Sequence, residues 1–263
     1  MSADDAFDRW VTALEERHLA TLTFPELSRA LRALSSTYVQ RRGQIGRGAA
    51  LAGAGKRAAF ALFYGPIHYL LVREIVLALP GATAPATTLV DLGCGTGASG
   101  AAWAGACASA TTAAGITGPR VVGIDRHPWA LEQAKWTYAS FGLPASTRQG
   151  DLSVAAFPKP PALVLAAFAV NELPDARRDA MLERLLDRGA NGDRVLVVEP
   201  IAGFVARWWG RSRDAFVARG GRADEWRFRL ELPPIVAKLD RAAGLDHREL
   251  TGRSLWLGPI MKQ

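Results

Sequence analysis

The sequence is poor in cysteine, which limits the kinds of protein it can encode. Only two cysteines, Cys94 and Cys107, occur in 263 residues. A disulfide framework and a four-thiolate metal site are therefore excluded, and we expect no bound metal. The first ten residues, MSADDAFDRW, are acidic and lack the basic region and apolar run of a secretory signal. On these absences we expect a cytoplasmic protein.

Long apolar runs are also missing. The longest segments without charge are Ala58–Val72, which Pro66 and His68 interrupt, and Leu92–Pro119, which is rich in Gly, Ser and Thr. A bilayer span needs about 18 or more consecutive, mainly apolar residues. Neither segment is predicted to cross a membrane, and we expect no membrane partner.

Acidic residues are absent between Glu26 and Glu74, and the chain carries a formal net charge of +7. The basic residues of that stretch are Arg29, Arg32, Arg41, Arg42, Arg47, Lys56, Arg57 and Arg73. An excess of positive charge points to an anionic partner such as nucleic acid, although an arginine-rich proteome produces the same balance.

A second basic stretch, GFVARWWGRSRDAFVARGG, combines arginines and tryptophans in the way that RNA-binding surfaces combine charge with stacking. The residues that would supply charge and stacking are Arg207, Trp208, Trp209, Arg211 and Arg213. The alternative is an amphipathic helix with arginines outward and tryptophans inward. The sequence leaves both open.

Periodicity divides the chain into two regions. Phe7, Trp10, Val11 and Leu14 follow helical spacing, and a similar pattern recurs around Leu27–Leu34, so residues 1–81 are predicted to form an N-terminal helical region. Residues 82–263 are predicted to form a second, larger domain.

Short apolar runs alternate with helix-like stretches in the second region. The runs are TLVDLG, RVVGID, PALVLAAFAV and RVLVVEP, and each ends in a polar or glycine-bearing turn. This alternation predicts an α/β fold: a doubly wound, mostly parallel, Rossmann-like sheet with an N-terminal helical cap. The last element, HRELTGRSLWLGPI, is predicted to close the sheet as an antiparallel edge strand. Ligands are expected at the carboxyl ends of the strands.

The stretch VDLGCGTGASG contains two overlapping cofactor patterns. From Gly93 it gives an acidic residue and G-x-G-x-G, the loop that holds S-adenosylmethionine; from Gly95 it gives G-x-G-x-x-G, the loop that holds a dinucleotide pyrophosphate. Asp91 ends the first strand, where a carboxylate repels a pyrophosphate and attracts an ammonium or sulfonium. We therefore favour S-adenosylmethionine and keep the dinucleotide as an alternative.

Two further carboxylates end the next strands. Asp125 is placed to accept hydrogen bonds from both ribose hydroxyls, and Asp151 from the adenine amine, with Arg126 and Leu152 beside the ring. The alternatives are local: Asp125 as the N-cap of the following helix, and Asp151 as a turn residue.

From Leu89 to the C-terminus the chain resembles the class I S-adenosylmethionine-dependent methyltransferases, which share the acidic glycine loop and the acidic residues after the second and third strands. The resemblance implies a methyltransferase with S-adenosylmethionine as cofactor. The residues expected to contact it are Asp91, Gly93, Cys94, Gly95, Gly97, Asp125, Arg126, Asp151, Leu152 and Phe168.

FYGPIHYLLV, AAFAVNELP and VVEPIAGF also resemble segments of methyltransferase-like proteins associated with the small ribosomal subunit. Members of that family commonly carry a cysteine cluster for an iron–sulfur centre beyond the fifth strand. The corresponding region here, GGRADEWRFRLELPP, contains no cysteine.

Methyl transfer needs mainly alignment of donor and acceptor, with an optional base. Asn171 and Glu172, in VNELP after the fourth strand, are the catalytic candidates, although Asn171 can instead cap the helix near Pro174. VNELP is not the Asn-Pro-Pro-aromatic motif of enzymes that methylate exocyclic base amines. The backbone carbonyls of Ala167 and Phe168 are placed to accept from the methionine ammonium.

Three other residues are weaker candidates. Glu199 ends the fifth strand, and Tyr64 and His68 are placed to roof the cofactor or to pack in the core. Cys94 is expected to be a small buried thiol, as is Cys107, because no histidine motif accompanies either.

The sequence thus predicts transfer of a methyl group to an N or O atom, with RNA, ribosomal RNA included, as the leading acceptor. A small-molecule methyltransferase with the helical cap as a lid is one alternative. The other is a weakly active or inert cofactor-binding factor in ribosome assembly.

Overall fold

The computed structural model describes residues 3–40, 51–111, 117–201 and 207–258. Its centre is a seven-stranded sheet in the order β3-β2-β1-β4-β5-β7-β6. The strands are β1 (Thr88–Leu92), β2 (Arg120–Asp125), β3 (Ala145–Gln149), β4 (Leu163–Ala167), β5 (Arg194–Glu199), β6 (Arg222–Phe228) and β7 (Leu250–Leu257). Strands β1 to β5 are parallel, and β7 runs antiparallel to both of its neighbours. The predicted doubly wound, mostly parallel sheet is confirmed.

The place of the last strand differs from the prediction. β7 is antiparallel as expected, but it lies between β5 and β6, so the edge strand is β6. Seven of its eight residues are buried, because both faces are covered: Leu255 packs on one side, while Ser254 accepts a hydrogen bond from Trp226 on the other. In β6 charged residues interrupt the apolar pattern, which is typical of an exposed edge and hides the strand in the sequence.

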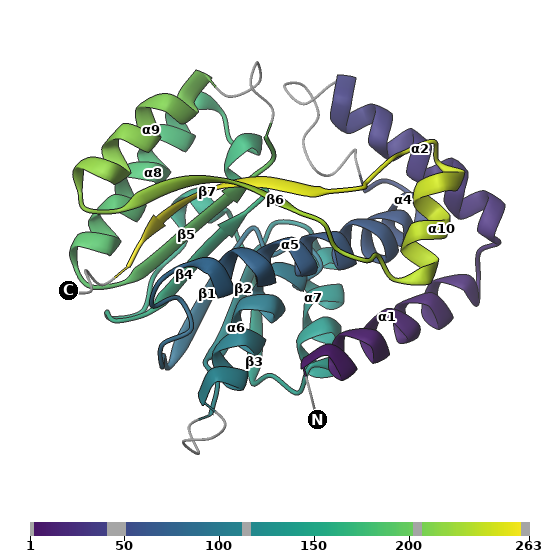
Figure 1. Ribbon diagram of the computed structural model, residues 1–263, viewed down its shortest axis with the longest axis horizontal. Helices are drawn as coiled ribbons and strands as arrows, with labels where there is room; N and C mark the ends of the chain where they lie inside the picture. Colours follow the sequence, from purple (N-terminus) through teal and green to yellow (C-terminus); the bar gives the residue numbers. More distant parts are fainter. Residues whose placement is uncertain (1–2, 41–50, 112–116, 202–206, 259–263) are drawn as a thin grey trace.

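Helices cover both faces of the sheet (Figure 1). One face is covered by α5 (Gly65–Ala78), α6 (Ala98–Thr111) and α7 (Pro128–Ser140), whose apolar residues share a core cluster with Leu89, Val121 and Leu196. The other face is covered by α8 (Asp175–Ala190) and α9 (Arg207–Ala218), which pack on the alternate residues of the same strands. This two-sided burial explains why the central strands are continuous apolar runs.

The N-terminal helices pack onto the first of these faces. α1 (Ala3–Leu19) places Phe7 against Tyr69 of α5, with ring centroids 4.8 Å apart, and buries Trp10. α2 (Phe24–Gln40) contacts α10 (Pro234–Ala242), where Lys238 lies 4.5 Å from the centre of the Phe24 ring. In Figure 1, α1, α2 and α10 lie together beside the sheet, so the helical group combines elements from both predicted regions.

A continuous helical stretch connects this group to the sheet. It comprises α4 (Ala54–Ala59), the π-helix η1 (Phe60–Tyr64) and α5. By length and composition Ala54–Ala78 is able to cross a membrane, unlike the shorter charge-free segment considered from the sequence, but 67% of its most apolar window is buried inside the protein. Such burial is what the core helix of a globular domain shows, and a single span of this kind is weak evidence for a membrane.

A buried carboxylate ties β1 to the helices beside it. Asp91 is 1% exposed, and its Oδ2 accepts a hydrogen bond of 2.8 Å from the hydroxyl of Tyr138 on α7. The same oxygen lies 2.3 Å from where a Cβ on Gly100 would be, so only glycine allows α6 to lie this close to β1. The third glycine of the G-x-G-x-x-G pattern is therefore required by packing against Asp91.

We predict that Tyr138→Phe lowers the free energy of unfolding by about 1–3 kcal/mol, because a buried carboxylate loses a hydrogen-bond donor. Thr137→Val is the matched control: the Thr137 hydroxyl is buried in the same helix without a hydrogen-bond partner among the described residues. Urea unfolding of both variants measures the difference. Equal losses in the two variants would show that the hydrogen bond to Asp91 is not what stabilises this packing.

Candidate functional site

The glycine loop follows β1 and turns sharply at three positions. Gly93, Gly95 and Gly97 have φ values of 65°, 53° and 80°, a region that side chains rarely adopt. A Cβ on Gly97 would also lie 2.9 Å from the Cα of Ala134 on α7. The Cys94 side chain is buried beneath the loop, beside Gly123 and 6% exposed. The loop therefore exposes backbone at the carboxyl end of β1, while Cys94 and Asp91 lie below it.

Asp125 joins this loop to the end of β2. Its Oδ2 accepts a hydrogen bond of 3.0 Å from the Gly95 N–H, and its Oδ1 accepts one of 2.9 Å from the His127 N–H. The N-cap of α7 is His127, so the alternative that Asp125 caps this helix is wrong. Instead, the carboxylate fixes the distance between the loop and the start of α7. It lies at the position expected of a residue that binds the ribose of a cofactor.

Asp151 has a local structural role after β3. Its Oδ1 accepts from the N–H and hydroxyl of Ser153, which caps the short helix η3 (Leu152–Val154), and its Oδ2 accepts from Arg126 and Arg177. Burial raises the pKa of this carboxyl, but the hydrogen bonds from Ser153 and Arg126 outweigh it, and the pKa is lowered. The turn interpretation is confirmed. An adenine amine would share Asp151 with two guanidinium groups.

The turn after β4 begins with a residue in an unusual backbone conformation. Phe168 has a φ of 56°, and its N–H donates to the Val198 carbonyl at 2.8 Å. Its ring stacks on that of His68, with centroids 3.9 Å apart and planes 15° apart. Strain of this kind in a non-glycine residue costs about 1–3 kcal/mol and is concentrated at functional sites. Tyr64 lies next to His68, at a ring distance of 5.9 Å.

Asn171 belongs to a hydrogen-bond network that the sequence does not reveal. Its Nδ2 donates to Glu199 Oε2 at 2.7 Å, and its Oδ1 accepts from Trp208 Nε1 at 2.8 Å. The N-cap of α8 is Pro174, so the capping alternative for Asn171 is wrong. With both ends of its amide held, Asn171 is fixed in orientation at the carboxyl end of β4, whereas Glu172 is exposed on η4 (Val170–Glu172).

Glu199 supports the same turn from the end of β5. Its Oε1 accepts from the N–H groups of Val170 and Asn171 at 2.8 and 3.0 Å. Burial raises the pKa of this carboxyl, as does the nearby Glu172, while the hydrogen bonds from Asn171 and Val170 lower it; the result is a pKa of about 7.

Arg253 on β7 is the register partner of Glu199 and was not identified from the sequence. It is 5% exposed, and its guanidinium carbon lies 4.0 Å from the centre of the Trp209 ring. Among the described residues, its Nε and Nη2 atoms have no hydrogen-bond partner. No sequence motif pairs Glu199 with Arg253, because only the antiparallel pairing of β5 with β7 brings them together.

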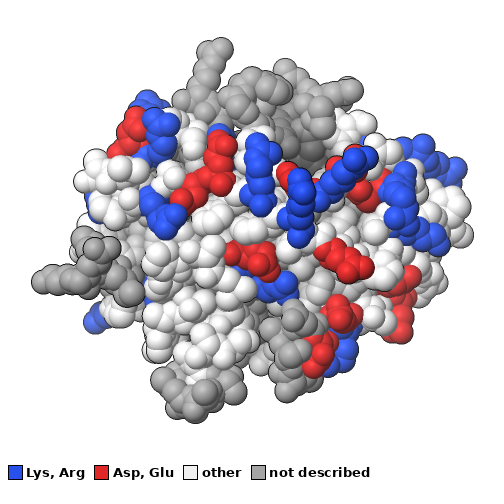
Figure 2. Space-filling view, viewed as in Figure 1, with Lys and Arg blue, Asp and Glu red and all other residues white. Residues whose placement is uncertain are grey.

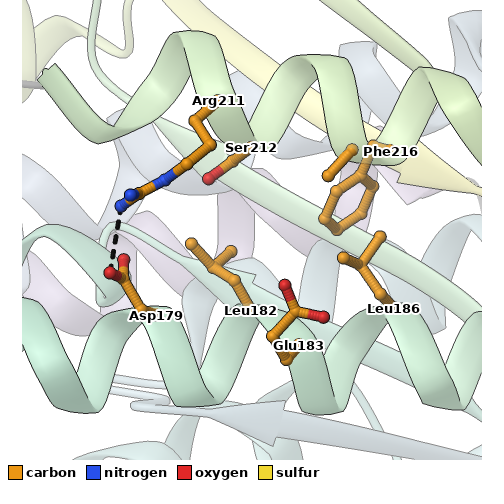
Figure 3. Close-up of a pocket in the computed structure, with 8 residues that line it drawn as sticks. Asp179, Leu182, Glu183, Leu186, Arg211, Ser212 and Phe216 are labelled. Atoms are coloured by element: carbon orange, nitrogen blue, oxygen red, sulfur yellow. Dashed lines mark hydrogen bonds and ion pairs between the residues drawn. The ribbon is translucent and has the colours of Figure 1, made fainter.

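The second basic stretch does not form a stacking surface. Trp208 and Trp209 are 4% and 9% exposed, so the RNA-stacking interpretation is wrong and the amphipathic helix is confirmed. Figure 3 shows Arg211 pointing from α9 towards Asp179 on α8, where the two form an ion pair of 2.9 Å. Both belong to the lining of a pocket between α8 and α9, and none of the lining residues is a predicted cofactor residue. The lining residues are Asp179, Leu182, Glu183, Leu186, Arg211, Ser212, Ala215 and Phe216.

Part of the remaining positive charge also lies beside negative charge, whereas Arg29 and Arg32 of the first basic stretch are exposed on α2. On the face shown in Figure 2, Asp and Glu side chains lie among many of the described Lys and Arg side chains. Arg213 pairs with Asp214, and Arg219 with Glu183 and Asp187. Arg41, Arg42, Arg47 and the side chain of Arg207 lie outside the described residues.

Both thiols are buried, as expected from the sequence. Burial raises the pKa of Cys107 to about 11, although the nearby Arg194 lowers it. A thiol with such a pKa is protonated at neutral pH and is a poor nucleophile.

We predict that Glu199 makes stability depend on pH between about 4.5 and 7. Over that range the folded state keeps a proton that the unfolded state releases, so the free energy of unfolding falls by roughly 3 kcal/mol as pH rises and then levels off. Glu199→Gln should remove this decline in urea titrations at several pH values, while Glu132→Gln, on the exposed side of α7, should keep it. An unchanged decline in Glu199→Gln would assign it to other groups.

Comparison with known proteins supports the fold. No protein-family model and no curated protein matches the sequence. The structure of mitomycin 7-O-methyltransferase is similar at 16% identity, with a TM-score of 0.51, covering 94% of this chain and 72% of that one. A predicted O-methyltransferase from Nostoc punctiforme is similar at 14% identity, with a TM-score of 0.52 and coverages of 91% and 72%.

A third structure, a predicted class I S-adenosylmethionine-dependent methyltransferase from Listeria monocytogenes, is similar at 12% identity, with a TM-score of 0.50 and coverages of 99% and 90%. None of these three neighbours supports the narrower resemblance to proteins of the small ribosomal subunit. Likeness at these identities establishes the architecture: the chain has the Rossmann-like fold of class I methyltransferases.

Proposed function

We propose that this protein is an S-adenosylmethionine-dependent methyltransferase that acts on an O or N atom of a small molecule. One observation carries the cofactor assignment. The Asp125 carboxylate lies at the carboxyl end of β2, hydrogen-bonded to the Gly95 N–H in a loop of three glycines with positive φ. In a doubly wound sheet this position receives the ribose of a bound nucleotide.

The residues around the loop fit such a cofactor. Asp125 would accept from the ribose hydroxyls, and backbone of the loop from Gly93 to Gly97 approaches the ligand because glycine leaves no side chain in the way. Leu152 and Arg126 would flank the adenine, and the carbonyls of Ala167 and Phe168 would accept from the ammonium. S-adenosylmethionine supplies an activated methyl group when bound. The chain's own residues orient the two partners and exclude water.

Three features argue against the dinucleotide alternative. The Gly95 N–H, which a pyrophosphate would need, already donates to Asp125. The sheet also has an antiparallel β7 inserted beside β5, whereas the dinucleotide-binding fold has the order 3-2-1-4-5-6. The third glycine of the dinucleotide pattern, Gly100, is accounted for by packing against Asp91.

A small-molecule acceptor has more support than RNA. The tryptophans expected to stack on RNA are buried, and Arg211 and Arg219 are paired with carboxylates of α8. One similar structure is that of a methyltransferase acting on mitomycin. An RNA acceptor, or a factor in ribosome assembly, remains an alternative that rests on the net charge and on the first basic stretch, of which Arg29 and Arg32 are exposed on α2.

We expect the purified protein to bind S-adenosylmethionine with micromolar affinity in calorimetric titration and not to bind NAD. Asp125→Asn should weaken binding about tenfold or more, because a charged acceptor for two hydroxyl donors becomes a neutral one. Asp214→Asn, on the outer side of α9, should bind like the wild type. Binding of NAD alone would overturn the cofactor assignment, and binding of neither would favour the assembly-factor alternative.

The acceptor class is tested separately by incubating the protein with radiolabelled S-adenosylmethionine and either small-subunit RNA or a metabolite extract. Label in the extract and none in the RNA is the expected result. Label in the RNA would restore the nucleic-acid prediction.

A further inference from the structure

Four partly exposed aromatic side chains lie together at the carboxyl ends of β1 and β4. Phe60 and Tyr64 come from η1, His68 from α5 and Phe168 from the turn after β4. Their ring centroids are 6.0 Å apart for Phe60–Tyr64, 5.9 Å for Tyr64–His68 and 3.9 Å for His68–Phe168. We call these four residues the aromatic cluster. Other aromatic residues of the same helical stretch, Phe63 and Tyr69, are instead buried in the core.

The aromatic cluster lies next to the glycine loop. A Cβ on Gly95 would lie 3.6 Å from Phe60, and one on Gly65, which follows Tyr64, would lie 3.6 Å from the Thr96 hydroxyl. The helical stretch before the sheet thus passes directly over the loop. The contact is between segments distant in sequence, so it does not follow from either motif alone.

The sheet order places the aromatic cluster on the methyl side of the proposed cofactor. Asp125 on β2 and Leu152 after β3 lie on one side of β1, and Phe168 after β4 lies on the other. A cofactor with its ribose at Asp125 and its adenine at Leu152 therefore extends its methionine half towards β4. The acceptor must approach the methyl group from that half.

Two backbone irregularities coincide at the aromatic cluster. Phe60 and Tyr64 begin and end a π-helical turn, and Phe168 holds a φ of 56°. Both conformations are less favourable than a regular one and are found mostly at functional sites. The rings carried by both irregular segments lie in the same cluster.

We infer that the aromatic cluster binds the methyl acceptor, and that the acceptor is a flat aromatic compound with a hydroxyl group. This inference rests on the proposed function. Partly exposed rings favour a flat aromatic partner, which gains from stacking as well as from burial. None of the four residues bears a fixed charge, which favours a neutral acceptor over one with phosphates.

His68 adds a proton acceptor to the aromatic cluster. The hydroxyl oxygen of the acceptor forms the new O–C bond while the S–C bond of the donor breaks, and the electron pair of that bond stays on sulfur. The hydroxyl proton passes to a ring nitrogen of His68 and from there to water. A base of this kind contributes about 10²- to 10⁴-fold to such a reaction.

The test uses esculetin, a flat aromatic diol, as acceptor and as binding probe. The full chain saturated with S-adenosylhomocysteine is titrated with esculetin, and methyl transfer is followed with radiolabelled S-adenosylmethionine. We expect His68→Ala and Phe168→Leu to weaken esculetin binding about tenfold or more, because each removes a stacked ring. His68→Phe should bind within about threefold of the wild type but transfer about 100-fold more slowly, because the ring remains and the nitrogen is lost.

Phe157→Ala is the matched control. Phe157 is a partly exposed aromatic residue before β4, at the opposite end of that strand, where Arg184 lies 5.0 Å from its ring centre. This variant should bind esculetin and S-adenosylmethionine as the wild type does. Circular dichroism and urea unfolding establish that each variant is folded.

The affinity for S-adenosylmethionine separates this inference from the proposed function. If the aromatic cluster binds the acceptor, His68→Ala, His68→Phe and Phe157→Ala keep that affinity within about twofold, below the change that loss of one contact produces. If His68→Ala loses it together with esculetin binding, the cluster roofs the cofactor and the inference is wrong. Absence of esculetin binding to a wild-type protein that binds S-adenosylmethionine also overturns it.

Failure of the wild type to bind S-adenosylmethionine overturns the proposed function instead. Esculetin is then titrated into the free protein. Binding that depends on His68 and Phe168 would keep the aromatic site as a ligand site, and binding that is absent or independent of them would overturn it.

Discussion

The close packing of α6 and α7 against β1, around the buried carboxylate of Asp91, is the constraint on which the site depends. Gly100 lets α6 approach the strand, and Tyr138 gives the carboxylate a hydrogen-bond donor. With β1, α6 and α7 fixed, the loop from Leu92 to Ala98 must connect β1 to α6 over a short distance. It turns sharply enough because its glycines adopt positive φ values. Asp125 then binds the loop from the neighbouring strand. The motif that resembles a ligand site is therefore also a packing motif.

Carboxylates at the ends of the parallel strands have three different roles, although they look alike in the sequence. Asp91 is buried and supports the core, Asp125 joins the loop to α7, and Glu199 holds the turn after β4 through Val170 and Asn171. All three are buried, and their roles differ because their hydrogen-bond partners differ. Burial without a direct ion pair in the described structure raises the pKa of Glu199 to about 7, while Asp151, which two arginines contact, has a lowered pKa.

The helices before the sheet form part of the site as well as the core. α1 and α2 bury apolar faces against α5 and α10, and this fixes the helical stretch that carries Phe60, Tyr64 and His68 over the glycine loop. The part of the proposed site that would bind the adenosine of the cofactor thus comes from the loops after β1, β2 and β3. The aromatic cluster comes from the preceding helices and the turn after β4.

The sequence by itself determined the sheet, the glycine loop and Asp125, because each follows from local pattern: apolar runs of strand length, glycines in a turn, and a carboxylate at a strand end. It also determined that both cysteines are buried. Only the tertiary structure decided the position of β7 inside the sheet and the strand register that places Arg253 opposite Glu199. The same holds for the contacts of Asn171 with Glu199 and Trp208. The tertiary structure also decided that the tryptophans of α9 face inward and that the π-helical turn lies over the loop. These features depend on register and packing between distant segments, which no local period encodes.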